Sequence, residues 1–305
     1  MATAYSEFDT TSTNVVADIK TKILLSADWA NITGNIVKAT TTRGAQMVVD
    51  LANAAATTRE LQFGVYRTHN GTTGVDKLVR YVMCRPNAST PLTTDPLHCR
   101  VSAGKEHLFI SLEGPRRGEN APDDATNGSG RSYFWLGDLV PYFSGDTVPA
   151  VVLIASTVTG NYSNQQTVWV SRDATNSLSW VPAGLVTLTT PRFSDHTDTG
   201  SVSNVQRTAA ADSNKVYLSP YVVVDEAAGI RGRLAKAFFA GWNEAWTAGD
   251  PMVATFSRCT YDSETYIVIP PGRSASSTAN CLAFGQVPAS TTYLDAGPLV
   301  AIPQS

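Results

Sequence analysis

Residues 131–156 read RSYFWLGDLVPYFSGDTVPAVVLIAS and constrain the fold of this chain more than any other segment. Aromatic and β-branched side chains, which favour strands, are dense in it, and Gly-Asp, Pro-Tyr and Ser-Gly-Asp turn signals interrupt them. The segment ends in the apolar run of residues 150–155, and no acid, base and nucleophile are arranged in it for chemistry. We predict two or three short strands whose aromatic rings pack into a core or against another subunit.

The composition allows a large folded core but only a weakly charged surface. Hydrophobic residues make up 43% of the 305 positions, which excludes wholesale disorder. Charged residues make up only 16%, against roughly 25% in typical soluble domains. A surface with so little charge opposes close packing with neighbours only weakly, as suits an assembly subunit. The net charge of −3 argues against nucleic acid as the main partner.

The sequence contains no targeting or membrane-spanning signal. No apolar run approaches the roughly 20 residues that a spanning helix needs, so we expect no membrane span. The N-terminal sequence MATAYSEFDTTST lacks the basic and apolar regions of a signal peptide. We therefore expect a soluble protein made in a cytosol, with four reduced and mostly buried cysteines. A disulfide between Cys84 and Cys99 is the best alternative, because the segments around them could be neighbouring strands.

Residues 11–27 form the one convincing amphipathic helix of the sequence. Apolar side chains recur there with helical spacing, and Asp18 and Lys22 are an i,i+4 pair on the other side. Thr11 or Ser12 can cap the N-terminus of this helix. We expect the helix to dock on its own domain, with docking on a neighbouring subunit as the alternative.

From residue 36 onward, strands and turns replace the helical pattern. Strands are predicted at residues 46–51, 61–67, 77–83, 106–112, 167–171, 184–190, 216–225, 252–258, 264–269, 281–284 and 299–302. Asn70-Gly71 indicates a hairpin, Pro220 divides residues 216–225 into a pair of strands, and residues 230–240 could be a strand or a short helix. We therefore predict a mainly β fold with some α, in which antiparallel sheets form a β-sandwich or barrel-like arrangement with an N-terminal amphipathic helix.

The chain divides into three regions by pattern. Residues 1–30 hold the N-terminal helix and its anchor, residues 31–156 form a β-rich domain, and residues 157–305 form a second β-rich region, which could belong to the same domain. The boundary rests on a change in composition after residue 156. Long loops at residues 114–130 and 195–211 are candidates for contact with other molecules.

The residues that could carry chemistry do not form a recognisable site. His98 stands beside Cys99, but no histidine has a second ligand at a metal-binding spacing. Residues 194–198 contain the residue types of a hydrolytic triad, yet adjacent residues cannot generally adopt its geometry. Residues 123–134 lack ligands that a calcium loop requires. The sequence leaves one alternative open, which is glycoside hydrolysis by two carboxylates that lie far apart in the chain. We predict no enzyme activity, no metal and no cofactor.

Three parts of the chain resemble structural proteins of tailed-bacteriophage virions. The first is DIKTKILLSADW at residues 18–29, a helix closed by tryptophan. The second joins LFISLEGPR to SYFWLGDLVPYFSGDTVPAVVLIAS, where Gly137, Pro141, Tyr142 and Pro149 carry the similarity. The third joins GIRGRLAKAFF, GDPM and ETYIVI. The resemblance is one of pattern and brings no catalytic signature with it.

The resemblance implies a structural virion component of the tail or baseplate, present in symmetric copies and assembled in the host cytoplasm. Its partners would be other copies of itself and other virion proteins. A receptor- or glycan-binding protein at the tail tip, which would contact a host-surface receptor, is one alternative. A head decoration or neck protein and a cell-wall or capsule hydrolase are the others.

The interface candidates combine helix and aromatic anchors with two loop arginines: Ile19, Ile23, Trp29, Phe134, Trp135, Tyr142, Phe143, Arg116 and Arg117. The alternative for each of the rings is that it fills the chain's own core. The alternative for the arginines is that water solvates them.

Overall fold

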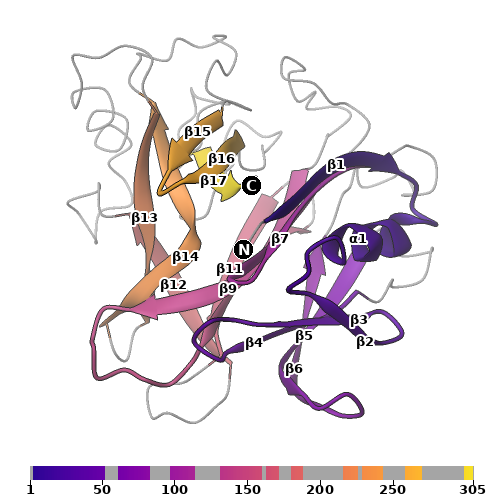
Figure 1. Cartoon of the computed structure of the whole chain (residues 1–305), viewed down its shortest axis with the longest axis horizontal. Coiled ribbons are helices and arrows are strands. Elements are labelled where there is room, and N and C mark those ends of the chain that lie inside the picture. Colours follow the sequence, from indigo (N-terminus) through magenta and orange to yellow (C-terminus); the bar gives the residue numbers. More distant parts are fainter. Residues whose placement is uncertain are drawn as a thin grey trace.

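The structure, a computed structural model, describes residues 3–51, 61–82, 97–113, 131–159, 163–171, 180–187, 216–225, 229–242, 258–269 and 299–304. In this part of the chain the fold is mainly β, with antiparallel sheets and one short helix (Figure 1). The predicted fold class is confirmed.

The described elements are one helix and two sheets of strands. The helix is α1 Val15–Ile23. The strands of the N-terminal half are β1 Ala4–Thr10, β2 Ala30–Thr33, β3 Ile36–Thr40, β4 Gln46–Asp50, β5 Leu61–His69, β6 Gly74–Val82, β7 Leu97–Gly104, β8 His107–Glu113 and β9 Arg131–Pro141. The later strands are β10 Val151–Thr159, β11 Ser163–Val170, β12 Val181–Thr187, β13 Val216–Asp225, β14 Gly229–Trp242, β15 Arg258–Tyr261, β16 Glu264–Ile269 and β17 Leu299–Pro303.

Six strands of the larger sheet form a closed ring of antiparallel pairings. The twelve-stranded sheet has the order β1-β7-β8-β9-β10-β11-β12-β13-β14-β17-β16-β15, and β9 pairs additionally with β14. One edge of β9 pairs with β8 as far as Gly137 and then with β14 from Leu139 to Pro141. Strands β9 to β14 therefore curl back on themselves, and β13 and β14 stand on the left of Figure 1. The strands β8-β7-β1 and β17-β16-β15 extend from this ring as two wings.

The five-stranded sheet and α1 cover one face of the larger sheet. The smaller sheet has the order β2-β3-β4-β5-β6 and lies with α1 on the right of Figure 1. Helix α1 is amphipathic as predicted, because its side chains Val15, Val16, Ile19 and Ile23 are buried. They belong to one core cluster with side chains of β3, β4, β5 and β7 to β10. The helix therefore docks on its own chain.

The apolar run of residues 150–155 belongs to a segment that is buried on both faces. Its odd-numbered side chains join the core under α1 and the five-stranded sheet. Its even-numbered side chains join a second core, which the ring and both wings share. The same alternation on β9 sends Phe134 into the first core and Trp135 into the second. Burial on both faces explains why this segment reads as continuously apolar.

The structure corrects the predicted start of the helix. Helix α1 begins at Val15, and its N-cap is Asn14, whose side chain makes no capping hydrogen bond. The predicted caps, Thr11 and Ser12, lie in the preceding turn, in which the Thr11 carbonyl accepts the backbone N–H groups of residues 14 and 15. A turn closed by backbone contacts leaves no role for a side-chain cap at those positions.

The expected Asp18–Lys22 pair is replaced by contacts with β1. Asp18 accepts a hydrogen bond from the hydroxyl of Thr10. The Lys22 ammonium lies 5.5 Å from the centroid of the Phe8 ring. Both residues thus join the helix to the strand that precedes it.

Strand predictions in the C-terminal half need one further correction. Residues 216–225 form a single strand, β13, rather than a pair interrupted at Pro220. The proline is accommodated by a register shift between Pro220 and Val222, where β13 pairs irregularly with β14. The open question at residues 230–240 is answered, since they lie within the strand β14.

The Asn70-Gly71 hairpin between β5 and β6 is confirmed. The Asn70 N–H donates to the Thr73 carbonyl across 3.2 Å. Gly71 has a φ of 101°, a left-handed conformation that glycine adopts without a steric cost.

Several predictions lie outside the described residues: the loops at 114–130 and 195–211, the strand at 281–284, the strand at 252–258 except for its last residue, the segment at 194–198 and Cys84. Cys99 is buried on β7, and both the predicted reduced state and the alternative, a disulfide with Cys84, stay untested. The expected domain boundary falls at the hairpin of β10 and β11, two strands that pair from Val152 and Val170 to Thr159 and Ser163. The division into domains also stays a prediction.

Candidate functional site

The pairing of β1 with β7 gathers charged side chains on one face of the larger sheet. Glu7 is opposite Arg100 and Asp9 is opposite His98 in this antiparallel register. Alternate residues of a strand share a face, so Tyr5 lies on the same face as these four residues. The intervening residues of β7, among them Cys99, are in the core on the other face.

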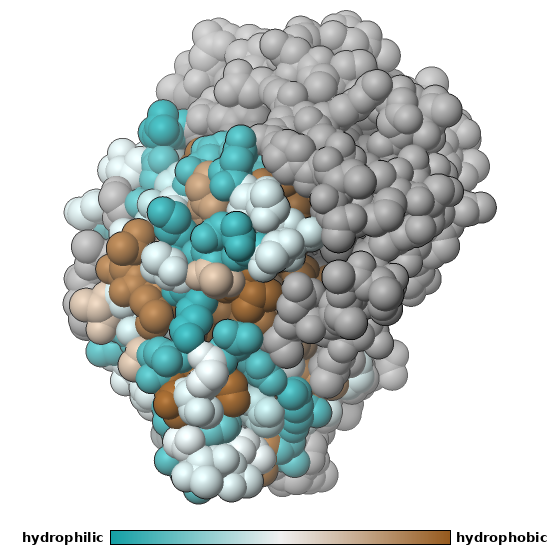
Figure 2. All heavy atoms as spheres, turned by 90° about the vertical axis from the view of Figure 1, so that its right-hand side faces the viewer, coloured by the Kyte–Doolittle hydropathy of each residue, from teal (hydrophilic) through white to brown (hydrophobic). Residues whose placement is uncertain are grey.

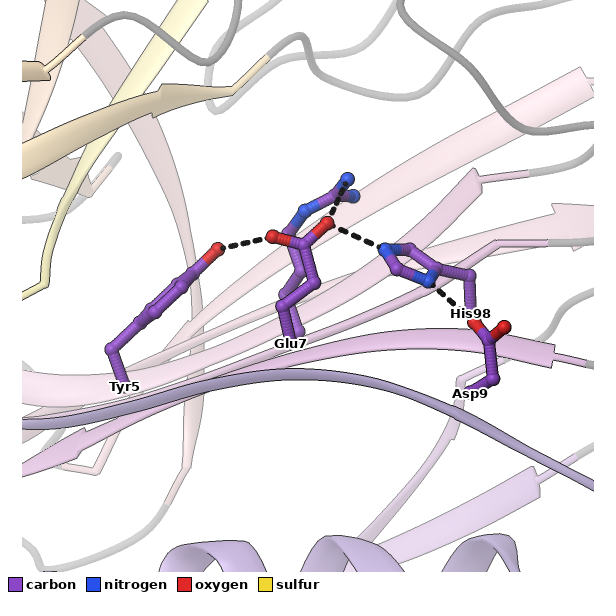
Figure 3. A network of polar contacts seen from close by, with 5 residues as sticks. Tyr5, Glu7, Asp9 and His98 are labelled. Atoms are coloured by element: carbon purple, nitrogen blue, oxygen red, sulfur yellow. Dashed lines mark hydrogen bonds and ion pairs between the residues drawn. The ribbon is translucent and has the colours of Figure 1, made fainter.

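Contacts between these five side chains form a continuous network (Figure 3). One oxygen of Glu7, Oε1, accepts from Arg100 Nη2 at 2.9 Å and contacts His98 Nε2 at 2.7 Å. Its second oxygen, Oε2, accepts from the Tyr5 hydroxyl at 3.4 Å. The other ring nitrogen of His98, Nδ1, lies 2.8 Å from Asp9 Oδ1. The imidazole thus bridges two carboxylates of the N-terminal strand.

The number of N–H groups on the His98 ring determines the charge of this network. A neutral imidazole carries one N–H, whereas the imidazolium carries two, so only the charged form of His98 donates to both Glu7 and Asp9. With that proton the two carboxylates balance the imidazolium and the Arg100 guanidinium. The hydrogen bond from His98 is the main reason why the pKa of Glu7 falls from 4.5 to about 2. Burial raises the pKa of Tyr5, so its phenol stays protonated and able to donate.

The network is suited to joining strands rather than to turning over a substrate. The Arg100 side chain is 5% exposed, while the Asp9 carboxylate at the far end is 59% exposed. Both oxygens of Glu7 and both ring nitrogens of His98 are committed to partners within the network. Its contacts fasten β1 to β7.

A second polar pair, Ser102 and His107, is buried between the wings. The Ser102 hydroxyl donates to the Pro303 carbonyl at 2.6 Å and lies 2.8 Å from His107 Nε2. Because the serine proton is used toward Pro303, His107 must donate from Nε2 to the serine oxygen. Burial, and then the charge of Lys236, lower the pKa of His107 to about 3. Its neutral ring stacks on Trp135 at 5.3 Å between centroids.

This donor direction is the reverse of what a serine nucleophile requires. A general base must accept the serine proton, and here the histidine donates instead. Ser102 and His107 are also almost completely buried, at 0% and 1% exposure. The pair therefore joins β7 and β8 to β17.

A third cluster is a pair of carboxyl groups at the junction of the two sheets. Asp138 of β9 is buried, and Glu106 lies in the turn between β7 and β8. The turn of residues 41–45, between β3 and β4, contacts both: Thr41 Oγ1 is 3.4 Å from Asp138 Oδ1, and the Thr42 N–H donates to Glu106 Oε1 at 3.0 Å. Burial, followed by the charge of Glu106, raises the pKa of Asp138 to about 7.

The described part of the chain holds no cluster of three or more His, Cys, Asp or Glu side chains placed to bind a metal. None of its helices is long and apolar enough to cross a membrane.

Most of the predicted interface residues lie inside the chain. The buried ones, at 4% exposure or less, are Ile19, Ile23, Trp29, Phe134 and Trp135. Trp29 also donates from Nε1 to the Gly104 carbonyl at 3.0 Å. These side chains fill the chain's own core, which is the alternative left open by the sequence.

Tyr142 and Phe143 are different, because they are 47% and 66% exposed in the loop after β9. The predicted Arg116 and Arg117 lie outside the described residues. On the face that carries α1 and the five-stranded sheet, Figure 2 shows small groups of hydrophobic residues among hydrophilic ones.

None of the three clusters was predicted from the sequence, and the β1–β7 network and the carboxyl pair differ in the signal that could have indicated them. The first left a weak signal, since Tyr5, Glu7 and Asp9 alternate with Ser6 and Phe8 as on a strand with one polar face. The second left none, because Glu106 and Asp138 are brought together only by the register of β8 with β9.

No protein-family model matches this chain, and no curated protein matches it in sequence.

Proposed function

We propose that this chain is a structural subunit of a bacteriophage virion, in the tail or baseplate, and that it acts through contacts with copies of itself and with other virion proteins. The bacteriophage part of the proposal comes from the sequence resemblance. The part that concerns interfaces is supported by one observation in the structure, the exposed aromatic pair Tyr142 and Phe143.

The aromatic pair sits in a loop that is anchored at several points. Arg43 Nη2 donates to the Asp146 carbonyl at 3.2 Å, and the Asp146 N–H donates to the Phe143 carbonyl at 3.0 Å. At the base of the loop, the Leu139 N–H donates to the Ala150 carbonyl at 3.0 Å. Large rings held on an ordered loop lose little conformational entropy on binding and are typical anchors of protein interfaces.

The polar groups of the described residues also support a structural role over an enzymatic one. The three clusters described above connect strands and turns of the same chain. In the Ser102–His107 pair, the closest approach to a catalytic dyad, the hydrogen bonds run in the wrong direction for attack on a substrate.

The molar mass of the chain in solution tests the self-contact. We expect light scattering at rising concentration to show an oligomer that the double variant Tyr142→Ser, Phe143→Ser disrupts. Leu25→Ser is the matched control, because Leu25 is 61% exposed and lies outside this loop. The same mass for the double variant, the control and the unchanged chain would contradict an interface at this loop.

Electron microscopy tests the virion assignment separately. Antibodies against the chain should label the tail or baseplate of phage particles that carry it. Label on heads alone would contradict the tail placement, and particles without any label would contradict the virion assignment.

A further inference from the structure

In the carboxyl pair Asp138 and Glu106, at the junction of the sheets, one buried oxygen lacks a hydrogen-bond donor among the described residues. Asp138 is 2% exposed. Glu106 uses Oε1 to accept the N–H and the hydroxyl of Thr42, whereas its Oε2 is buried and has no donor among the described residues. A protonated Asp138 supplies the missing donor, since a carboxylic acid has an O–H and a carboxylate has none. Two ionised carboxylates at this place would leave a buried oxygen unsatisfied.

The charged groups that face Asp138 from the described elements are Glu106, from the turn between β7 and β8, and Arg43, from the turn between β3 and β4. Arg43 is already engaged, because its Nη2 bonds the Asp146 carbonyl. Its Nε is buried without a partner among the described residues. The same guanidinium therefore anchors the aromatic loop and favours the ionised form of Asp138.

We propose that Asp138 and Glu106 share one proton and form a pH-operated latch, which fastens the turn of residues 41–45 and the loop of residues 142–149 to the larger sheet. With the proton in place, the pair carries a single negative charge, Thr41 and Thr42 dock on it, and Arg43 bonds the loop. When the proton leaves, the two carboxylates repel each other, which moves Glu106 away from Thr42, and both compete with the Asp146 carbonyl for Arg43. The turn and the loop then each lose an anchor.

Burial and the neighbouring carboxylate place the transition near neutrality, where the pKa of Asp138 lies at about 7. Because an ordinary Asp titrates near 3.9, an unburied carboxyl at this position would leave the latch open throughout the neutral range. The latch depends on contacts within one chain and is independent of the proposed virion role.

Amide hydrogen exchange at about pH 5.5 and about pH 8.5 tests the latch, after correction for the intrinsic pH dependence of exchange. We expect the amides of Thr42 and Asp146 to lose about tenfold or more of their protection at the higher pH, the factor that corresponds to one pKa unit. Core amides of β10 should keep theirs and serve as the internal reference.

Three variants separate the latch from a general effect of pH. In Asp138→Asn, the amide donates permanently to Glu106 and cannot ionise, so protection should stay high at both pH values. In Glu106→Gln, the amide donates to the Asp138 carboxylate and favours its ionised form, so the transition should move to lower pH. Asp262→Asn is the matched control at an exposed turn, where asparagine tolerates the φ of 49°, and it should respond as the unchanged chain does.

Two results would overturn the proposal. One is equal protection of Thr42 and Asp146 at both pH values in the unchanged chain. The other is a response to pH that persists in Asp138→Asn. Carbon-13 NMR of the Asp138 carboxyl offers an independent check, because titration in the ordinary acidic range would show that no proton is shared.

Discussion

At the residue scale, the partners of each ionisable side chain decide whether it carries a charge. Glu7 and Asp138 are both carboxyl groups of strands in the larger sheet, yet their pKa values shift in opposite directions. Glu7 faces Arg100 and His98, which stabilise its charge. Asp138 faces another carboxyl group in a buried place. As the pH rises, ionisation of Glu7 therefore stabilises the folded state, whereas ionisation of Asp138 destabilises it.

Replacing Glu7 with Gln should lower the free energy of unfolding at neutral pH by about 1 kcal/mol, because a carboxylate that is 40% exposed is partly screened by water. The folded pKa of about 2 lies below the ordinary value of 4.5, so the unfolded chain binds more protons between these limits. The contribution of Glu7 is therefore complete above the unfolded pKa and is lost as the pH falls toward 2. Urea unfolding of both proteins over this range measures the difference.

The Asp262→Asn variant provides the baseline for this comparison, since Asp262 is exposed at the turn between β15 and β16. A difference between Glu7→Gln and the unchanged chain that stays constant from neutral pH to about pH 2 would contradict an ionic role of Glu7.

At the scale of elements, ring closure depends on one narrow crossing between β9 and β14. Gly232 of β14 is paired with Pro141 of β9. A Cβ atom at Gly232 would lie 2.3 Å from the Val140 carbonyl oxygen and 2.9 Å from the Pro141 Cα. Both neighbours are backbone atoms, which cannot rotate away as a flexible side chain would. Glycine is needed here because two backbones approach closely.

Gly232→Ala should therefore destabilise the protein by about 1–3 kcal/mol, the range typical of overpacked sites. Gly145→Ala is the matched control, because a Cβ there meets nothing within 4 Å, and it should change the stability by less than about 0.5 kcal/mol. Thermal or urea unfolding of the two variants measures the effect. Equal stability of both would show that the β9–β14 crossing does not constrain the ring.

Local patterns predicted most strands and the helix, whereas the ring itself was beyond them. The segment at residues 131–156 yielded β9 and β10 because its aromatic and β-branched residues act over short distances. Its Gly137-Asp138 turn signal was wrong, since β9 continues through both residues. Nothing local indicates that Leu139 pairs with Leu234. The Pro220 error arose similarly, because a bulge against β14 accommodates a residue that usually interrupts a strand.

The candidate site was predictable only in part for the same reason. Tyr5, Glu7 and Asp9 alternate visibly in the sequence, but their partners on β7 depend on a register that no short motif encodes. For the aromatic residues, the sequence suggested interface positions where the structure has core positions, as at Phe134 and Trp135. Composition alone could not distinguish buried Phe134 from exposed Phe143. The one local difference is that turn signals flank Phe143.

At the scale of the whole molecule, buried polar contacts hold the two wings together. Ser102 on β7 reaches the Pro303 carbonyl of β17, so the first wing is bonded directly to the second. A second link, between Lys236 of β14 and Glu264 of β16 at 2.6 Å, joins the ring to the same wing. Apolar side chains of both wings and of the ring also pack together in the second core. The fold therefore depends on a few specific donors as well as on apolar area.

Ser102→Ala should lower the free energy of unfolding by about 1–3 kcal/mol, because it leaves the Pro303 carbonyl and the His107 Nε2–H buried without partners. Ser111→Ala is a matched control on β8. Ser111 is equally buried, but its hydroxyl has no hydrogen-bond partner among the described residues. Removing that hydroxyl breaks no hydrogen bond with a described residue, so the stability of Ser111→Ala should equal or slightly exceed that of the unchanged chain.

The comparison separates a specific bond from the general cost of altering a buried serine. Both variants remove one oxygen from the same face of the same wing, and only one of them breaks the contact with β17. Urea unfolding should therefore rank Ser102→Ala clearly below Ser111→Ala, and hydrogen exchange in β16 and β17 should increase only in the former. If both variants lose stability equally, the wings are joined by packing alone and the Ser102–Pro303 bond contributes nothing of its own.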